Sequence, residues 1–298
     1  MRKNQKIYIP AFALLTTCSY LYPNLLGYDS FTAGTDNSAG EYELNPDSSY
    51  TDRYSLEGTQ NPALSGFTGT WERLSGASSP FALGDPGSGS LQSELASSLA
   101  YSDGTNTLVT SGNAAYRPFG TAGSFRSLDV ANLGADGSTM YFSYLMEVGG
   151  DAGYVEFSEN SASDGSGLSY GTDGVDFLAT VDGSSTNLGA KNGDTQFVVW
   201  KVDFGASSDD WSLWVNPSDL TSETTASLTG SAAGIDPTTL VLARSGNSGG
   251  TKGLLVDEIR IGTNWNSVTP VPEPTTAAGV ASLLAFLFVL SKKRKRLI

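Results

Sequence analysis

The sequence predicts an all-β protein, an antiparallel β-sandwich with a hydrophobic helix at the C-terminus. Two observations favour strands over helices in the body of the chain. Short apolar or alternating runs recur, and turn-forming Gly, Asp and Asn residues separate them. Between Tyr28 and Pro270, only Ser90–Ala100 has a pattern suited to a short helix. Many short strands bounded by turn signals are typical of antiparallel sandwiches and barrels.

The expected strands are rich in aromatic and β-branched residues, or alternate between apolar and polar ones. In chain order they are Thr107–Ser111, Ala114–Phe119, Thr139–Val148, Tyr154–Phe157, Val175–Val181, Phe197–Phe204, Trp211–Val215, Leu240–Ala243 and Leu254–Ile261. The expected turns are Gly149-Gly150-Asp151, Asp182-Gly183, Asn192-Gly193-Asp194 and Asp209-Asp210.

Alternation within two of these strands predicts which side chains face the core. In the Phe197 strand we expect an inward face made of Val198, Trp200, Val202 and Phe204. In the last strand, Glu258 and Arg260 should share a face that can be solvated. Asp257 falls on the opposite face among apolar residues, where it requires a polar partner.

Residues 1–27 are predicted to be a signal peptide. Arg2, Lys3 and Lys6 precede a short apolar core, Ile7–Leu15, which is the layout of a secretory signal. Cleavage after Gly27 would leave Tyr28 at the mature N-terminus. Leu25 suits that cut poorly, so cleavage within Thr17–Ser19 is the alternative.

The single cysteine, Cys18, lies inside this predicted signal. It is either an apolar residue of the signal or a lipid attachment point, although Thr17 does not fit the lipoprotein pattern. In both cases the body has no disulfide.

Residues 271–298 contain three parts in a fixed order. A short motif, Val271, Pro272, Glu273 and Pro274, precedes an uncharged apolar run, Ala277–Leu290. A basic cluster follows, made of Lys292, Lys293, Arg294, Lys295 and Arg296. As a helix the apolar run is about 21 Å long, a marginal span for a hydrocarbon core about 30 Å thick. The basic cluster predicts a cytoplasmic C-terminus with the body outside, and the prolines predict an exposed, extended spacer.

This order of segments resembles the PEP-CTERM sorting signal of Gram-negative bacteria. The resemblance implies an exosortase-type membrane enzyme as partner and a transient stage anchored in the inner membrane. It also implies a final location at the cell surface or in the extracellular polysaccharide matrix. The alternative is an ordinary C-terminal membrane anchor.

Residues 28–270 resemble a concanavalin A-like, or laminin-G-like, jelly roll. The matching stretches are Tyr28-Asp29-Ser30-Phe31, Phe197–Phe204, Trp211–Pro217 and Val256–Gly262. The last of these, an apolar-Asp-Glu-apolar-Arg-apolar strand, is the most characteristic. The resemblance implies one sandwich domain of a kind that can bind carbohydrate and a structural calcium ion.

Composition excludes several function classes. The chain has no histidine, which excludes Ser-His-Asp and Cys-His catalysis and His-dependent metal sites. Of its 17 basic residues, three lie within residues 1–6 and five within 292–298. The nine that remain accompany all 31 acidic residues, so residues 7–291 carry a net charge of −22. A body this acidic does not bind nucleic acid through its phosphates.

The sequence shows no paired carboxylates on one strand face. Glu156 and Glu159 are three residues apart and Asp257 and Glu258 are adjacent, so on regular strands the members of each pair point to opposite faces. We therefore expect no catalytic residues and no enzyme activity. The alternative is a glycoside hydrolase whose carboxylates come from separate strands.

The remaining candidates are binding residues. Trp211 and Trp214 are three apart, so one should face inward and the other outward, where it could stack on a sugar; Trp71 and Trp265 are further candidates. Asp209 and Asp210, and the Asp173–Asp176 loop, offer oxygen ligands for calcium; no other cofactor is indicated. The sequence thus predicts an exported, non-enzymatic protein with a structural, adhesive or weak glycan-binding role.

Overall fold

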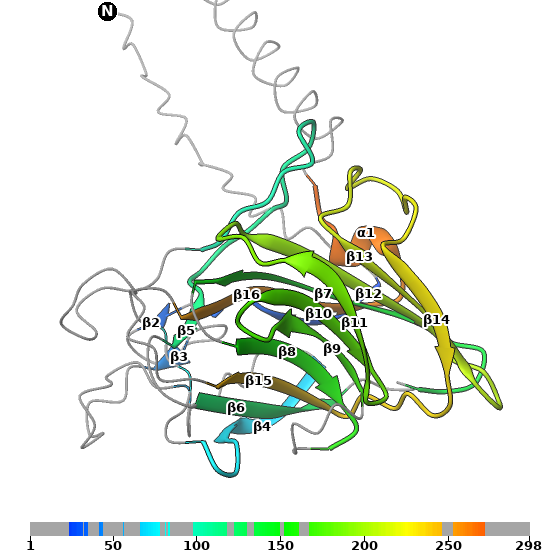
Figure 1. The fold of residues 1–298 in the computed structure, drawn as a ribbon, viewed down its shortest axis with the longest axis horizontal. Helices are drawn as coiled ribbons and strands as arrows, with labels where there is room; N and C mark the ends of the chain where they lie inside the picture. The colour runs from blue at the N-terminus through cyan, green and yellow to red at the C-terminus, as the bar shows by residue number, and fades with distance from the viewer. Residues whose placement is uncertain are drawn as a thin grey trace, which may run out of the picture.

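The computed structural model describes residues 24–31, 33–34, 42–43, 56, 66–77, 81, 83, 98–117, 122–129, 134–149, 152–160, 167–245 and 253–271. This part of the chain is nearly all β-structure. Two antiparallel sheets of seven strands each lie face to face, which is the arrangement of a β-sandwich (Figure 1).

The first sheet has the strand order β1-β16-β7-β12-β13-β14, and β5 pairs with part of β16. Its strands are β1 (Leu25–Asp29), β5 (Ala115–Arg117), β7 (Thr139–Val148), β12 (Gln196–Asp203), β13 (Asp209–Val215), β14 (Leu228–Ala232) and β16 (Leu254–Gly262).

The second sheet has the strand order β11-β10-β9-β8-β15-β6-β4. Its strands are β4 (Gly66–Arg73), β6 (Ala122–Asp129), β8 (Ala152–Ser158), β9 (Leu168–Thr172), β10 (Asp176–Val181), β11 (Ser184–Ala190) and β15 (Thr239–Ser245). Outside the two sheets, β2 (Ala33–Gly34) and β3 (Tyr42–Glu43) form a short parallel pair, and α1 (Trp265–Val268) is a single helical turn.

The main core fills the space between the two sheets. Phe142 on β7 and Phe157 on β8 meet there with ring centroids 4.6 Å apart. The inward residues predicted for β12 (Val198, Trp200, Val202 and Phe204) all belong to this core, which confirms that assignment.

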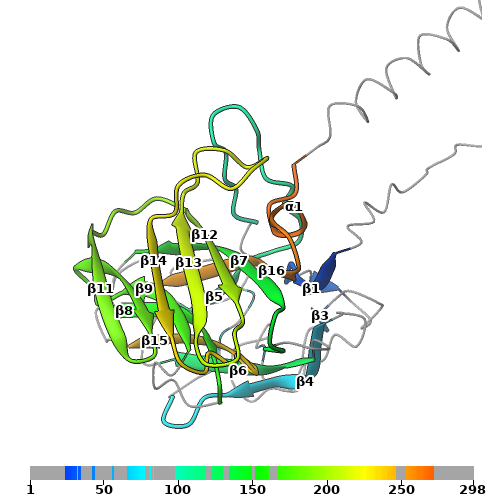
Figure 2. The same cartoon turned by 90° about the vertical axis from the view of Figure 1, so that its right-hand side faces the viewer.

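A second apolar layer covers the outer face of the first sheet. It brings Phe197 and Trp214 of that sheet together with Leu108, Leu220 and Trp265, which come from the segments packed over it. Figure 2 shows α1 lying over β16 and β7 on this side. The first sheet is therefore buried on both faces along β7, β12 and β16.

The N-terminal and C-terminal parts of the described chain meet at one side of the sandwich. The amide of Thr263, just after β16, donates to the carbonyl of Asn24, just before β1, at 3.0 Å. Since β1 and β14 are the opposite edges of the first sheet, this meeting point is remote from β14 (Figure 2).

The strand predictions were accurate where strands are apolar. Thr139–Val148 matches β7 in both bounds, and the predicted strands from Tyr154, Val175, Phe197, Trp211, Leu240 and Leu254 all correspond to observed ones. Two predictions were wrong. Thr107–Ser111 contributes only an isolated bridge between Ser102 and Thr107, and Asp209-Asp210 begins β13 instead of forming a turn.

The last strand departs from simple alternation because it contains a β-bulge. Its register against β7 shifts between Asp257 and Arg260, and Glu258 has a left-handed φ of 54°. After the bulge, Ile259 and Ile261 join Leu254 and Val256 in the main core. The predicted solvated face is therefore wrong, because Glu258 and Arg260 are buried.

The two predicted helices fall wholly or partly outside the described residues. The expected C-terminal helix, Ala277–Leu290, lies outside the described residues, as do residues 90–97 of the other helix candidate. No helix within the described ranges has the length and apolar character to cross a membrane. Val271, which we expected in an exposed spacer, is partly buried against the second apolar layer.

Candidate functional site

The five tryptophans differ sharply in exposure. Four of them (Trp71, Trp200, Trp214 and Trp265) are buried in one of the two apolar layers. Trp211 on β13 is partly exposed. Because all five lie in the described part of the chain, Trp211 is the indole best placed to meet a ligand.

Trp211 and Trp214 face opposite sides of β13, as their spacing predicted. Trp214 faces away from the second sheet and packs edge-on against Trp265, with ring centroids 5.2 Å apart. Its Nε1 donates to the carbonyl of Thr224 at 2.9 Å. Trp214 is thus held inside the outer layer, whereas Trp211 faces the space between the sheets.

Trp211 lines a groove at the edge of the sandwich where β14 of the first sheet approaches β10 and β11 of the second. We call this the edge groove. It has a volume of about 200 Å³ and is lined by Ala179, Val181, Asp182, Ser184, Thr186, Trp211, Leu228, Ser231 and Ala232. Its floor is apolar, whereas Asp182, Ser184, Thr186 and Ser231 at its rim are exposed polar residues.

The indole of Trp211 is held from two sides. It crosses the buried Trp200 edge-on, with centroids 5.9 Å apart and an interplanar angle of 61°. On the other side it lies against Gly230 of β14, where an added Cβ would meet indole Cζ2 at 2.5 Å. The ring is therefore positioned by the fold before any ligand binds.

The polar rim is positioned by a tight hairpin. β10 and β11 are joined at Asp182-Gly183, and both residues have positive φ, 45° and 72°. Two consecutive left-handed residues are typical of a type I′ turn, which matches the twist of the flanking strands. This turn was predicted, and it places the Asp182 carboxylate at the mouth of the edge groove.

The calcium candidates Asp209 and Asp210 do not converge. Both oxygens of the buried Asp209 carboxylate accept backbone N–H groups, from Gly205 at 3.0 Å and from Ile235 at 2.7 Å. Asp210 is exposed and accepts from the hydroxyl of Ser231. Within the described residues no group of three or more His, Cys, Asp or Glu could hold a metal ion. The two hydrogen bonds of Asp209 connect the loop before β13 with the loop after β14.

In the Asp173–Asp176 loop, the other predicted source of calcium ligands, the carboxylate is likewise hydrogen-bonded to backbone N–H groups of the loop itself. Asp173 accepts the N–H groups of Val175 and Asp176 at 2.8 and 2.9 Å. These hydrogen bonds hold the pKa of its carboxyl below the usual value. The two hydrogen bonds therefore stabilise the turn between β9 and β10.

A second hollow lies on the outer face of the second sheet. It has a volume of about 280 Å³ and is lined by Ala152, Tyr154, Glu156, Ser169, Gly171, Thr172, Asp173, Leu178 and Thr180. Glu156 is a fully buried carboxyl from β8, and Asp173 comes from the turn after β9. A carboxyl group from a strand and one from a turn therefore line one pocket, an arrangement the sequence could not show.

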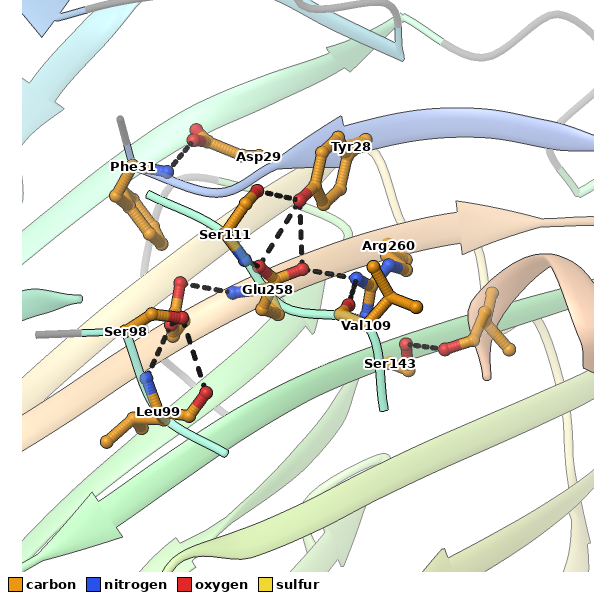
Figure 3. A network of polar contacts seen from close by, with 12 residues as sticks. Tyr28, Asp29, Phe31, Ser98, Leu99, Val109, Ser111, Ser143, Glu258 and Arg260 are labelled. Atoms are coloured by element: carbon orange, nitrogen blue, oxygen red, sulfur yellow. Dashed lines mark hydrogen bonds and ion pairs between the residues drawn. The ribbon is translucent and has the colours of Figure 1, made fainter. Parts of the chain in front are cut away.

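The Asp-Glu pair of the last strand forms a polar network with the segment packed over it (Figure 3). Asp257 accepts from the hydroxyl of Ser98 and the amide of Leu99, both at 2.8 Å. This confirms that Asp257 requires a partner. Burial first, and the neighbouring Glu258 second, raise the pKa of Asp257 to about 8.

Glu258 lies at the centre of the same network. Its carboxylate forms an ion pair with Arg260 and accepts from the hydroxyl of Tyr28 at 3.0 Å and from the amide of Ser111. Arg260 also donates to the carbonyl of Val109 at 2.5 Å. Burial raises the pKa of Glu258 despite the guanidinium, and raises the pKa of Tyr28 to about 12.

The network gives the acidic residues of the characteristic last-strand motif a structural role. The carboxylates of Asp257 and Glu258 both accept hydrogen bonds from the segment between Ser98 and Ser111. Together they fix this segment on the outer face of the first sheet. No substrate-facing role follows from this geometry.

Sequence reasoning identified Trp211 but missed its groove partners. β11 and β14 are polar, Gly-containing strands, and neither has the apolar alternation that predicts a strand. Val181 and Trp211 also lie on different sheets, so only the fold brings them together.

The fold and the groove define a two-sheet β-sandwich with an open edge, and comparisons place it beside several solved structures. The receptor binding domain of botulinum neurotoxin D matches with a TM-score of 0.38 and 10% identity, over 54% of this chain and 43% of that one. The Trypanosoma rangeli sialidase matches with a TM-score of 0.34 and 12% identity, over 54% of this chain and 27% of that one.

Lectin UEA-II in complex with galactose matches with a TM-score of 0.31 and 13% identity, over 54% of this chain and 90% of the lectin. This chain thus aligns with less than half of the toxin domain and of the sialidase. Structural similarities with TM-scores this low do not indicate a function. No family model and no curated protein matches the chain.

Proposed function

We propose that this is an exported, surface-associated, non-enzymatic protein that binds uncharged carbohydrate in the edge groove. The observation that carries the proposal is the position of Trp211. It is the partly exposed indole among five, and it lies in a groove whose rim is made of hydroxyl groups and one carboxylate.

The groove supplies the groups that a sugar requires. An indole offers a large apolar surface to the C–H face of a sugar ring. Ser184 and Thr186 offer hydroxyls that donate and accept, and Asp182 offers an acceptor pair. A cavity of about 150 Å³ is enough for a benzene ring, so a groove of about 200 Å³ suits one sugar unit.

The charge of the groove favours neutral sugars over acidic ones. Among the described residues that line it, Asp182 is the single charged one, and the surrounding body is strongly acidic. A uronate or sialate would approach this carboxylate, and no Lys or Arg is among the described residues that line the groove. Like charges at close range oppose binding, so the ligand class we propose is uncharged hexose polymers.

The position of the groove suits a protein attached by its opposite side. Asn24 and Thr263 meet at the β1 edge of the first sheet, whereas the groove lies at the β14 edge. A domain held to a surface through the chain leading into Asn24 or out of Val271 would keep the groove turned away from that surface.

Export and sorting are the second part of the proposal and rest on the sequence. The basic and apolar start of the chain directs secretion. The Val271–Pro274 motif, the apolar run and the basic cluster direct sorting by an exosortase-type enzyme, through an inner-membrane intermediate to the cell surface or matrix. Cell fractionation of a tagged chain tests this. Recovery in the cytoplasm alone would contradict it.

The binding proposal is tested by affinity electrophoresis of the protein in gels that contain soluble neutral glucan, mannan or galactan. Gels with polyuronate or sialylated glycan form the acidic comparison. We expect retardation in at least one neutral gel and none in the acidic gels. Retardation in no gel would overturn carbohydrate binding, and retardation in acidic gels alone would overturn the proposed ligand class.

A second candidate function is glycoside hydrolysis in the hollow beside Glu156. The specific observation is that Glu156 of β8 and Asp173 of the turn after β9 line the same pocket. Hydrolases need two carboxyl groups about 5 to 9.5 Å apart. Release of reducing sugar by the wild type, abolished by Glu156→Gln and retained by Trp211→Ala, would favour this function over binding.

A further inference from the structure

Strand β1 is an integral part of the sandwich, although its first residues fall within the predicted signal peptide. Leu25 pairs with Gly262, Gly27 with Ile261, and Asp29 with Ile259. The carbonyl of Asn24 accepts from Thr263 at 3.0 Å. The described fold therefore includes Asn24 and the residues that follow it, and does not start at Tyr28.

Gly27 closes the contact between the two sheets on this side. A Cβ built on Gly66 of β4 would meet the Cα of Gly27 at 2.5 Å, and one built on Gly27 would meet the Ile261 side chain at 3.3 Å. The backbones of β1 and β4 thus pass in direct contact. Removing residues 25–27 would expose Ile261, which is fully buried in the main core.

A new terminus at Tyr28 would also place a positive charge beside another. Tyr28 is the register partner of Arg260, and the guanidinium carbon of Arg260 lies 5.1 Å from the centroid of the Tyr28 ring. An α-ammonium group on Tyr28 would add a second positive charge to this partly buried region, where Glu258 already pairs with Arg260. Introducing an unpaired charge there is unfavourable.

We propose that the export signal is cleaved upstream of Asn24 and that the mature protein keeps β1 whole. The cut within Thr17–Ser19, which the sequence offers, agrees with this. Small residues follow the apolar core directly in this stretch (Thr16, Thr17, Cys18 and Ser19), as signal peptidases require. This inference rests on the proposed export. It excludes the cut after Gly27 and favours the upstream cut, a choice that sequence reasoning left open.

The test is to express the full chain in an exporting Gram-negative host and to identify its N-terminus by mass spectrometry. We expect a terminus before Leu25, and a lipidated Cys18 would satisfy this equally. A terminus at Tyr28 would overturn the cleavage site while leaving export intact. A leader retained on exported protein would overturn cleavage alone, whereas a leader retained on protein found only in the cytoplasm would overturn export as well.

Two substitutions of Gly27 test the cleavage site by the rate at which the leader is removed, which does not depend on whether the domain folds. Signal peptidases need a small residue directly before the cut, so Gly27→Leu would block cleavage after Gly27 and Gly27→Ser would allow it. We expect both variants to lose their leader as fast as the wild type in a pulse-chase experiment. Accumulation of precursor in Gly27→Leu alone would contradict the inference, whether or not the released domain folds.

Discussion

The indole of Trp211 lies against the backbone of Gly230, so closely that a Cβ on Gly230 would meet indole Cζ2 at 2.5 Å. Gly230 and Trp211 are register partners on β14 and β13. The absence of a side chain on one strand thus sets the position of the aromatic ring on the next.

Replacing Gly230 with valine should displace Trp211 and damage the edge groove. Overpacking of this kind costs about 1 to 3 kcal/mol of folding stability, and we expect carbohydrate affinity to fall about tenfold or more. Gly193→Ala is the control, because a Cβ there meets nothing within 4 Å. Thermal melts and affinity electrophoresis measure the two effects. Unchanged binding in Gly230→Val would show that the ring position does not matter.

Folding stability should decrease as the pH rises from about 4 to 8 because of Asp257. Its pKa is raised to about 8 in the fold, so the folded state binds a proton that the unfolded state has released. This contribution is fully present below the unfolded pKa of about 4 and is lost as the pH rises through 8. One proton gives a slope of at most about 1.4 kcal/mol per pH unit.

The measurement is urea unfolding of the wild type and of Asp257→Asn at pH 5 and pH 9. We expect the difference in unfolding free energy between the two pH values to be smaller in the variant. Glu258, whose pKa is raised in the same direction, retains part of the dependence. An identical pH dependence in both proteins would mean that Asp257 is ionised throughout.

The buried ion pair of Glu258 and Arg260 should be costly to break from one side. Arg260→Met leaves the Glu258 carboxylate without its cation, and we expect a loss of about 3 to 5 kcal/mol. Adding Glu258→Gln removes the orphaned charge and should recover part of that loss. A double-mutant cycle by chemical denaturation measures the coupling. Strictly additive losses would contradict a direct interaction.

Asp209 should stabilise the loops before β13 and after β14 without any metal. Asp209→Ala removes the acceptor for Gly205 N–H and for the buried Ile235 N–H, and should cost about 1 to 3 kcal/mol. Asp210→Ala, on the exposed face of the strand, should cost no more than about 0.5 kcal/mol. We expect the same melting temperature in calcium and in chelator. A calcium-dependent rise that Asp209→Ala abolishes would instead restore the metal site.

The sequence was most informative for strands whose own residues are mostly apolar or alternate between apolar and polar. β7 was predicted in full because its apolar and aromatic residues leave no alternative. The inward face of β12 followed from period-two alternation. By contrast, the bulge at Glu258 breaks that period without a glycine to mark it, so the burial of Arg260 could not be foreseen.

The edge groove was beyond sequence reasoning for a different reason. Trp211 and Trp214 were correctly assigned to opposite faces, but alternation cannot tell which face stays accessible. The outer face is covered by residues 98–114 and by α1, which are distant in sequence. Trp214 is therefore buried, and the accessible ring is the one that faces the second sheet.

The central claim is that Trp211 forms the floor of a carbohydrate site, and calorimetric titration tests it most directly. An oligosaccharide of the neutral polymer that retards the protein most in the gel assay would be titrated into the wild type and into Trp211→Ala, after circular dichroism has shown that both are folded. We predict saturable binding to the wild type and a loss of affinity of tenfold or more in the variant, about 1.4 kcal/mol or more. Equal affinities in the two proteins would contradict the account.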